Sequence, residues 1–115
     1  MGTLFHNPRC SKSRQTLALI DASGQSHDVI LYLKQPLDKD AIFSLLSRLE
    51  GDPKSLVRVG DTQFDEIAEY LDSPEGIAEL LSKRPELMQR PIFDNGSKAR
   101  VCRPPELVSE MLNDQ

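Results

Sequence analysis

The stretch GTLFHNPRCSKSRQTLALIDASGQSHDVILYL, residues 2–33, decides the fold. It begins with a short apolar run at residues 2–6, which predicts a strand. Apolar residues then recur at helical spacing across residues 13–24, and Gly24 is typical of a helix end. Residues 27–33 end in an unbroken run of apolar and aromatic side chains, which predicts a second strand. A strand, a helix and another strand form a βαβ unit, in which the two strands run parallel.

The middle of the chain, about residues 37–89, is predicted to be helical. Asp38 is a suitable N-cap for the first helix of this block. Its apolar face is formed by Ile42, Leu45, Leu46 and Leu49. Residues 53–58 predict one short helical turn, and residues 62–71 predict another helix with acidic residues on its outer side. A last helix is expected across residues 73–85, because it opens with Ser-Pro and closes at a proline.

The C-terminal part returns to a strand pattern. Asn95-Gly96 separates two short runs and is a strong signal for a β-hairpin. Residues 104–112 predict a closing helix. The order is therefore βαβ, a helical block and ββα, which predicts an α/β protein with a mixed four-stranded sheet covered by helices. This order suits a thioredoxin-like fold with helices inserted between its halves, and the 115 residues fit one domain, 1–115.

Charge and cysteine content narrow the class of protein. The formal net charge is −4, whereas nucleic-acid-binding domains are usually basic, so we expect no nucleic-acid partner. We see neither a signal peptide nor an apolar run long enough to span a membrane. Cys10 and Cys102 are too few for a disulfide framework, which favours a reducing, cytoplasmic compartment. Cysteine and histidine also supply too few ligands for a zinc site, so no metal is expected.

One cysteine has an unusual setting. The segment HNPRCSKSR, residues 6–14, places Cys10 among Arg9, Lys12 and Arg14 at the start of the first predicted helix. Unpaired N–H groups and the helix dipole favour negative charge there, and nearby cations lower a thiol's pKa further. The same N–H groups could hold an oxyanion. We therefore predict a reactive thiolate that meets an anion, and the alternative is an inert structural cysteine.

The neighbours of Cys10 suggest how it would react. Ser13 occupies the position of a second cysteine, so the loop has no Cys-x-x-Cys pair and any redox cycle needs an external thiol. The hydroxyl groups of Ser11 and Ser13 are candidate donors to an anion. His6, at the end of the first strand, could pair with the thiolate or orient the loop through its other nitrogen.

Three arginines are candidate anion ligands. Arg90 precedes Pro91, the position of a commonly cis proline in thioredoxin-like folds, and Arg103 precedes a Pro-Pro pair. With Arg58 they could clamp an oxyanion in bidentate fashion, although solvated surface arginines are the simpler alternative. Cys102, at the end of a predicted strand, is expected to pack in the core, and a disulfide with Cys10 is the alternative.

The chain resembles a known family, the glutaredoxin-coupled arsenate reductases. Five motifs occur in the family's order, and they are HNPRCSKSR, ILYL followed by a proline, LVR, RPI and VCRPPE. The resemblance implies that Cys10 is the nucleophile and that Arg58, Arg90 and Arg103 bind the anion. It also implies a thiolate-supporting His6 and a cis Pro91.

The resemblance further implies substrates and partners. Asn7, Ser13 and Arg14 would support substrate binding. Arsenate or a similar oxyanion would be the substrate, glutathione the co-substrate and glutaredoxin the protein partner, with no bound cofactor. Members dedicated to arsenic resistance continue into a charged tail, whereas this sequence stops at Gln115, so we expect a short member. Two alternatives remain, an Spx-like regulator, which would usually carry Cys-x-x-Cys, and a general glutathione-dependent thiol reductase.

Overall fold

A mixed four-stranded sheet forms the centre of the computed structural model, which describes residues 2–58 and 64–113. The strands are β1 Gly2–His6, β2 His27–Leu31, β3 Ile92–Asp94 and β4 Ala99–Val101, in the order β2-β1-β3-β4. β1 runs parallel to β2 and antiparallel to β3, and β3 and β4 are antiparallel. The predicted α/β class and mixed four-stranded sheet are confirmed.

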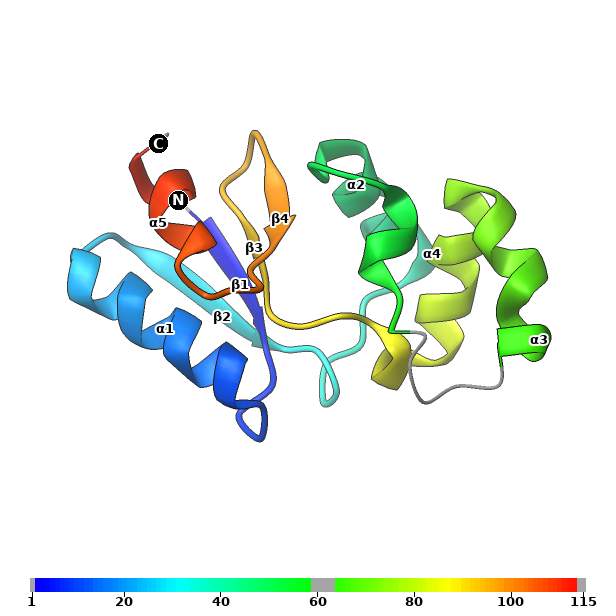
Figure 1. Cartoon of the computed structure of the whole chain (residues 1–115), viewed down its shortest axis with the longest axis horizontal. Helices are drawn as coiled ribbons and strands as arrows, with labels where there is room; N and C mark the ends of the chain where they lie inside the picture. Colours follow the sequence, from blue (N-terminus) through cyan, green and yellow to red (C-terminus); the bar gives the residue numbers. More distant parts are fainter. Residues whose placement is uncertain (1, 59–63, 114–115) are drawn as a thin grey trace.

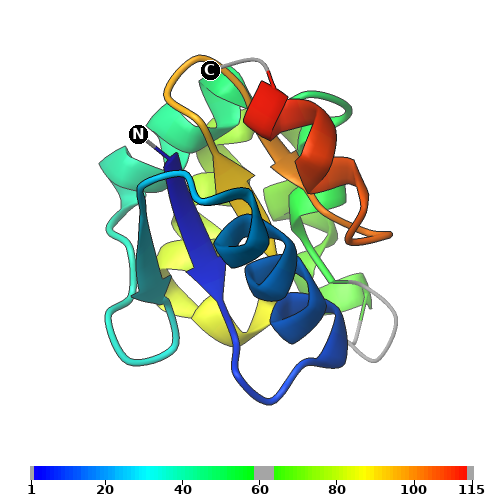
Figure 2. The same ribbon diagram turned by 90° about the vertical axis from the view of Figure 1, so that its left-hand side faces the viewer.

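Two helices, α1 Ser11–Ser23 and α5 Leu107–Asn113, cover one face of this sheet (Figure 2). α1 ends as predicted, because Gly24 takes the left-handed conformation with φ +74° and its N–H donates to the carbonyl of Asp21. Alternate strand residues point to this face. The core between the sheet and the two helices consists of Leu4, Ile20, Phe93, Cys102, Val108, Met111 and Leu112.

The helical insertion lies on the other side of the sheet, so the molecule has three layers (Figure 1). It contains α2 Lys39–Arg48, α3 Phe64–Ile67 and α4 Pro74–Lys83, with the 3₁₀ segments η1 Pro53–Leu56, η2 Ala68–Asp72 and η3 Pro85–Leu87. Both predicted N-caps form, since Asp38 accepts from the Ala41 N–H and Ser73 accepts from the Gly76 N–H. The first residues of the helix predicted at 62–71 lie outside the described residues.

A larger apolar core joins the insertion to the sheet. Phe5, Ile92 and Tyr32 point into this core. Phe5 and Ile92 are the chain neighbours of Leu4 and Phe93, which face α1 and α5 on the opposite side of the sheet. α2 and α4 supply most of the remaining side chains, including Ile42, Leu45, Ile77 and Leu81. Arg48 on α2 also reaches Asp94 on β3, with nitrogen–oxygen distances of 2.6–3.2 Å. The insertion is thus fixed against the sheet by apolar packing and an ion pair.

Several predicted boundaries differ from the observed ones. α1 begins at Ser11 rather than at residue 13, and the helix predicted across residues 62–71 is α3 followed by the 3₁₀ segment η2. Two further differences have a visible cause. β2 ends at Leu31 rather than at residue 33, because the N–H groups of Lys34 and Gln35 both donate to the Leu31 carbonyl and turn the chain. α5 begins at Leu107 rather than at residue 104. The turns before it are closed by bonds between residues three apart, such as Leu107 N–H to the carbonyl of Pro104, so they are not yet α-helical.

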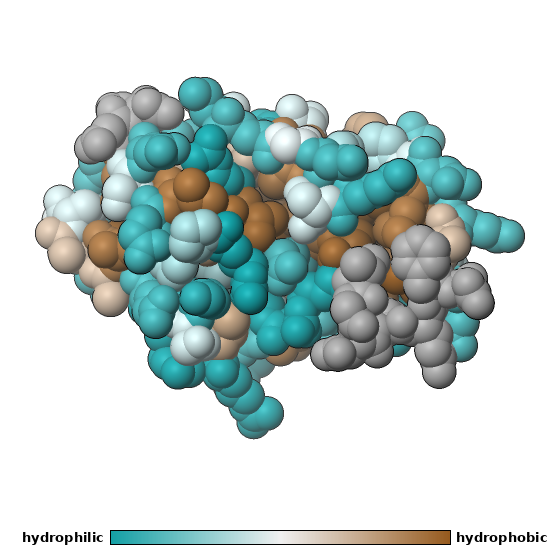
Figure 3. All heavy atoms as spheres, in the orientation of Figure 1, coloured by the Kyte–Doolittle hydropathy of each residue, from teal (hydrophilic) through white to brown (hydrophobic). Residues whose placement is uncertain are grey.

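The predicted hairpin forms, with a longer loop than the Asn-Gly signal suggests. Residues 95–98 separate β3 from β4, and Gly96 has φ +96°. The Asn95 side chain accepts hydrogen bonds from the N–H groups of Ser97 and Lys98. Among residues 2–58 and 64–113, no helix is both long and apolar enough to cross a bilayer. In the view of Figure 3, hydrophobic side chains show through a mostly hydrophilic surface.

Candidate active site

The loop between β1 and α1 holds Cys10 at the N-terminus of the helix. Cys10 has an extended backbone and is the N-cap of α1. Its N–H donates to the Asn7 carbonyl at 3.0 Å, and its carbonyl accepts from the Arg14 N–H at 3.0 Å. The side chain is half-buried, so the sulfur is shielded but reachable. The predicted position of the thiol at a helix N-terminus is confirmed.

The surroundings of Cys10 favour the thiolate. Burial by itself would raise the pKa of the Cys10 thiol, because a charge is less well solvated inside the protein. Hydrogen bonds from the N–H groups of Ser13 and Lys12 and from the Arg90 side chain outweigh burial and hold this pKa below its ordinary value. Arg90 also acts through its charge. Donors that lower a thiol's pKa in this way increase the fraction of thiolate, which is the nucleophilic form.

A buried network positions the loop. The Ser13 hydroxyl lies 2.6 Å from Nδ1 of His6 and accepts a hydrogen bond from the Asn7 N–H at 3.0 Å. Asn7 in turn accepts from the Arg9 N–H through its side-chain oxygen. The Ser13 hydroxyl was predicted to donate to an anion, but Ser13 is fully buried and its hydroxyl does not face an incoming anion. Its backbone N–H, and not its side chain, contacts the sulfur.

His6 fits one of its two predicted roles. Burial, together with the positive charge of Arg14, lowers the pKa of His6, so its ring is neutral at pH 7. A neutral ring bonded to Ser13 orients the loop, and it is not the cation that an ion pair with the thiolate requires. Arg14 donates from its guanidinium to the Pro8 carbonyl at 2.8 Å and so braces the same loop.

The three predicted arginines have different relationships to Cys10. Arg90 contacts the sulfur directly, and the peptide bond that joins it to Pro91 is cis. Arg103 is exposed and donates to the Arg90 carbonyl at 3.0 Å. Arg58 follows η1, and its charge acts on the hydroxyl of Tyr32, which also interacts with Arg90. The structure thus brings Arg90 to the Cys10 thiol, Arg103 to the Arg90 backbone and Arg58 within electrostatic range of Tyr32.

Tyr32 is a member of the site that the sequence analysis missed. Tyr32 is 1% exposed, its hydroxyl makes no hydrogen bond within the described residues, and the Asn7 side chain lies close enough to act on it. Burial raises the pKa of Tyr32, and the charges of Arg90 and Arg58 act in the opposite direction. The available signal was the single hydroxyl in the otherwise apolar motif ILYL, residues 30–33. That motif predicted only a strand.

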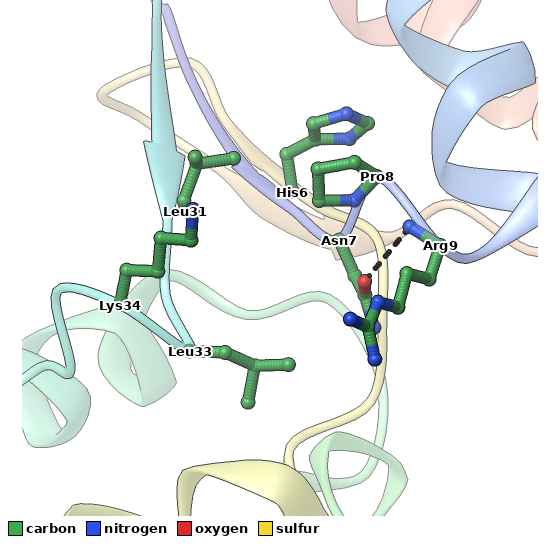
Figure 4. A pocket seen from close by; sticks show the side chains of 7 residues that line it. All are labelled: His6, Asn7, Pro8, Arg9, Leu31, Leu33 and Lys34. Carbon is green, nitrogen blue, oxygen red and sulfur yellow. Dashed lines mark hydrogen bonds between the residues drawn. The ribbon is translucent and has the colours of Figure 1, made fainter.

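A pocket of about 450 Å³ opens beside the loop (Figure 4). One wall is formed by residues 6–9 and the other by Leu31, Leu33 and Lys34. Arg9 and Lys34 lie on opposite sides of it, and Leu33 closes the lower end of the view. The pocket thus combines apolar walls with two cationic side chains. Four of its lining residues, 6–9, directly precede Cys10 in the sequence.

Cys102 is separate from this chemistry. It is fully buried between the sheet and α5, as predicted for a core residue. Burial raises the pKa of the Cys102 thiol to about 12, so it stays protonated. Both cysteines are free, so the alternative of a disulfide between Cys10 and Cys102 is wrong for this structure. In the described ranges, no three His, Cys, Asp or Glu side chains gather as a metal site would require.

Fold and site together define a thioredoxin-like protein with one activated thiol and no partner cysteine in its loop. Residues 5–111 match the ArsC family, and the chain belongs to that family. It is 38% identical to the uncharacterised protein YfgD of Escherichia coli, over 95% of this chain and 94% of the relative. It is 36% identical to an arsenate reductase of Haemophilus influenzae, over 95% and 97% of the two chains.

The solved structures agree with this assignment. An arsenate reductase from Vibrio cholerae superposes with a TM-score of 0.84 at 31% identity and covers 95% of both chains. The expected thioredoxin-like fold and the resemblance to the arsenate reductase family are therefore confirmed.

Proposed function

We propose that this protein reduces arsenate to arsenite, with Cys10 as the nucleophile. The observation that carries the proposal is the set of donors on the Cys10 sulfur, which are the N–H groups of Ser13 and Lys12 and the guanidinium of Arg90. These groups favour the ionised form of the sulfur and also offer positive potential to an approaching anion. The activity named for the relatives from Haemophilus influenzae and Vibrio cholerae supports the same reaction.

In the first step, the Cys10 thiolate attacks the arsenic atom of arsenate. A sulfur–arsenic bond forms, one arsenic–oxygen bond breaks, and the oxygen leaves as hydroxide or, once protonated, as water. Arsenic remains in the +5 state, because condensation moves no electrons. Arg90, which already contacts the sulfur, would neutralise charge on the arsenate oxygens as they crowd the reacting centre.

The other two arginines would complete the anion site. Arg103 is exposed and bonded to the Arg90 carbonyl, so its guanidinium can rotate towards a ligand beside Arg90. Arg58 acts on the same region through Tyr32. Guanidinium groups match pairs of oxyanion oxygens, and three of them suit a doubly charged tetrahedral substrate.

The electrons would come from outside the protein. The second cysteine is buried and fully protonated, and the loop has no other thiol, so Cys10 lacks an internal partner. Two external thiols are required, for which we propose glutathione and glutaredoxin. One glutathione would bond to the arsenic, the glutaredoxin thiol would take over the glutathionyl group as arsenite forms, and a second glutathione would regenerate glutaredoxin. In net balance, one arsenate and two glutathione thiols yield one arsenite, one glutathione disulfide and one water. A supply of reduced glutathione also implies the cytoplasm as the site of action.

We propose the pocket beside the loop as the place where glutathione binds. Glutathione is a small peptide with two carboxylates, and the pocket has a cation on each side, Arg9 and Lys34. Its volume of about 450 Å³ lies within the usual range for small-molecule sites. Residues 6–9, which line this pocket, directly precede Cys10 in the loop.

The test is an assay of arsenite release, with and without glutathione and glutaredoxin. Wild-type protein should release arsenite only when both are present. Cys10→Ser should be inactive, and Cys102→Ser, which alters the other thiol, should retain turnover. Full activity of Cys10→Ser would contradict the proposal. Reduction of glutathione mixed disulfides without any arsenite release would instead support the thiol-reductase alternative.

A further inference from the structure

Two buried polar atoms near Cys10 lack partners. Among the residues that the structure describes, the hydroxyl of Tyr32 and Nε of Arg90 make no hydrogen bond, and both atoms are shielded from solvent. Buried donors are nearly always paired, so an unpaired one calls for an explanation. Gln25 carries the only other such atom in the described part of the chain, and it lies at the opposite end of α1.

The two atoms belong to one place in the fold. Tyr32 interacts electrostatically with Arg90 and with the Cys10 sulfur, and Arg90 hydrogen-bonds to that sulfur. The N–H at Arg90 Nε can only donate, and the Tyr32 hydroxyl has a proton to donate as well. The Asn7 side chain also acts on the Tyr32 hydroxyl, but neither orphaned atom has an acceptor for its proton among the described residues.

The local backbone explains why Tyr32 points inward. β2 ends at Leu31, and the following turn is closed by hydrogen bonds from Lys34 and Gln35 to the Leu31 carbonyl. The turn directs the Tyr32 ring into the core between the sheet and the insertion, where the charges of Arg90 and Arg58 act on its hydroxyl. A phenylalanine would pack equally well there, so packing does not account for the hydroxyl.

We propose that the Tyr32 hydroxyl, together with Nε of Arg90, donates hydrogen bonds to one oxygen of the oxyanion that Cys10 attacks. Tyr32 is then a substrate-binding residue in addition to the three arginines. Arg90 is half-exposed, and a shift of its side chain on ligand entry opens both donors to the oxygen. The identity of the oxyanion as arsenate rests on the proposed function, whereas the placement of the donors does not.

The hydroxyl keeps its proton in the working range. Burial raises the pKa of Tyr32 above its ordinary value of about 10, so it is neutral and a donor at pH 7. It therefore adds a hydrogen bond without adding charge. The matched comparison is Tyr70, the other tyrosine of the chain, which lies in η2 of the insertion.

The experiment compares wild type, Tyr32→Phe and Tyr70→Phe. Arsenate and sulfate are titrated into each protein without glutathione, and the unfolding free energy is measured in urea without either anion. We expect Tyr32→Phe to raise the dissociation constant for both anions about 10-fold or more, because a hydrogen bond to a charged group is lost. Its unfolding free energy should equal or exceed that of wild type, because the lost hydroxyl had no partner. Tyr70→Phe should bind both anions as wild type does.

Three results would overturn the inference. They are wild-type anion affinity in Tyr32→Phe, an equal loss of affinity in Tyr70→Phe, and no binding of either anion by wild type. Failure of the proposed function looks different. The anions would still bind in a Tyr32-dependent manner, but no arsenite would be released. Conversely, arsenite release by Tyr32→Phe with an unchanged KM for arsenate would leave the function intact and remove Tyr32 from the site.

Discussion

The guanidinium of Arg90 hydrogen-bonds to the sulfur of Cys10, across the gap between the cis-proline loop and the first turn of α1. One side chain thus contributes twice. It lowers the pKa of the thiol before substrate arrives, and it is already in place to meet the negative charge of an oxyanion at that sulfur. Arg90 is therefore the residue whose loss should affect both binding and chemistry.

Replacement of Arg90 by alanine should lower kcat/KM for arsenate about 100-fold, because a preorganised donor to the transition state is lost. The pKa of Cys10 should rise in the same variant, since Arg90 is one of the groups that lower it. Steady-state kinetics with excess glutathione and glutaredoxin measures the first effect. The control is Arg84→Ala, because Arg84 forms only an exposed ion pair with Glu86. Equal activity of the two variants would contradict the assignment.

Ser13→Ala should destabilise the protein by about 1–3 kcal/mol. The substitution leaves Nδ1 of His6 and the N–H of Asn7 without their shared, fully buried partner. Urea denaturation measures the loss. Ser11→Ala, two positions away, is the control. The Ser11 side chain is exposed, so its loss should change the free energy of unfolding by no more than about 0.5 kcal/mol. The Cys10 pKa should change little, because the backbone N–H of Ser13 remains. Equal stability of the two variants would show that the network is unimportant.

The free energy of unfolding should fall as the pH drops below about 7, in part because of His6. An unfolded histidine has a pKa of about 6.5, and burial and Arg14 lower the pKa of His6 in the folded protein. The unfolded state therefore binds more protons, so stability is lost as pH falls through about 6.5 and levels off below the folded pKa. His6→Asn, which keeps an acceptor for Ser13, should show a shallower slope between about pH 5.5 and 8. Identical slopes would indicate that His6 titrates normally.

Lys34→Glu should raise the KM for glutathione and leave the KM for arsenate nearly unchanged. Lys34 is an exposed cation that lines the pocket, whereas the three arginines proposed to bind the oxyanion do not line it. Reversal of its charge should repel a carboxylate, and added salt should reduce the difference. Lys39→Glu, an exposed change at the start of α2, is the control. A normal KM for glutathione in Lys34→Glu would place the co-substrate elsewhere.

The sequence predicted the elements well because local chemistry decides them. Asp38 and Ser73 cap their helices through side-chain oxygens, and Gly24 ends α1 with a positive φ, so short-range patterns were sufficient. The ends of β2 and α5 depended on turn hydrogen bonds to Leu31 and Pro104, which no periodicity encodes. Those two boundaries were therefore misplaced.

The candidate site was only partly predictable. A cysteine at a helix N-terminus is visible in the sequence, since the first helix begins directly after it. The contact of Arg90 with Cys10 depends on how β3 pairs with β1, a long-range pairing that local sequence patterns only suggest. The burial of Ser13 and the inward turn of Tyr32 are tertiary features, and for this reason one role was assigned wrongly and one residue was missed.

A pH titration of thiolate absorbance tests the central claim most directly, which is that the fold holds Cys10 as a thiolate. Burial raises the pKa of Cys102 to about 12, so any transition near neutral pH reports Cys10 alone. We predict an apparent pKa for Cys10 clearly below that of a free thiol, about 8.5. A transition at or above that value would contradict the account.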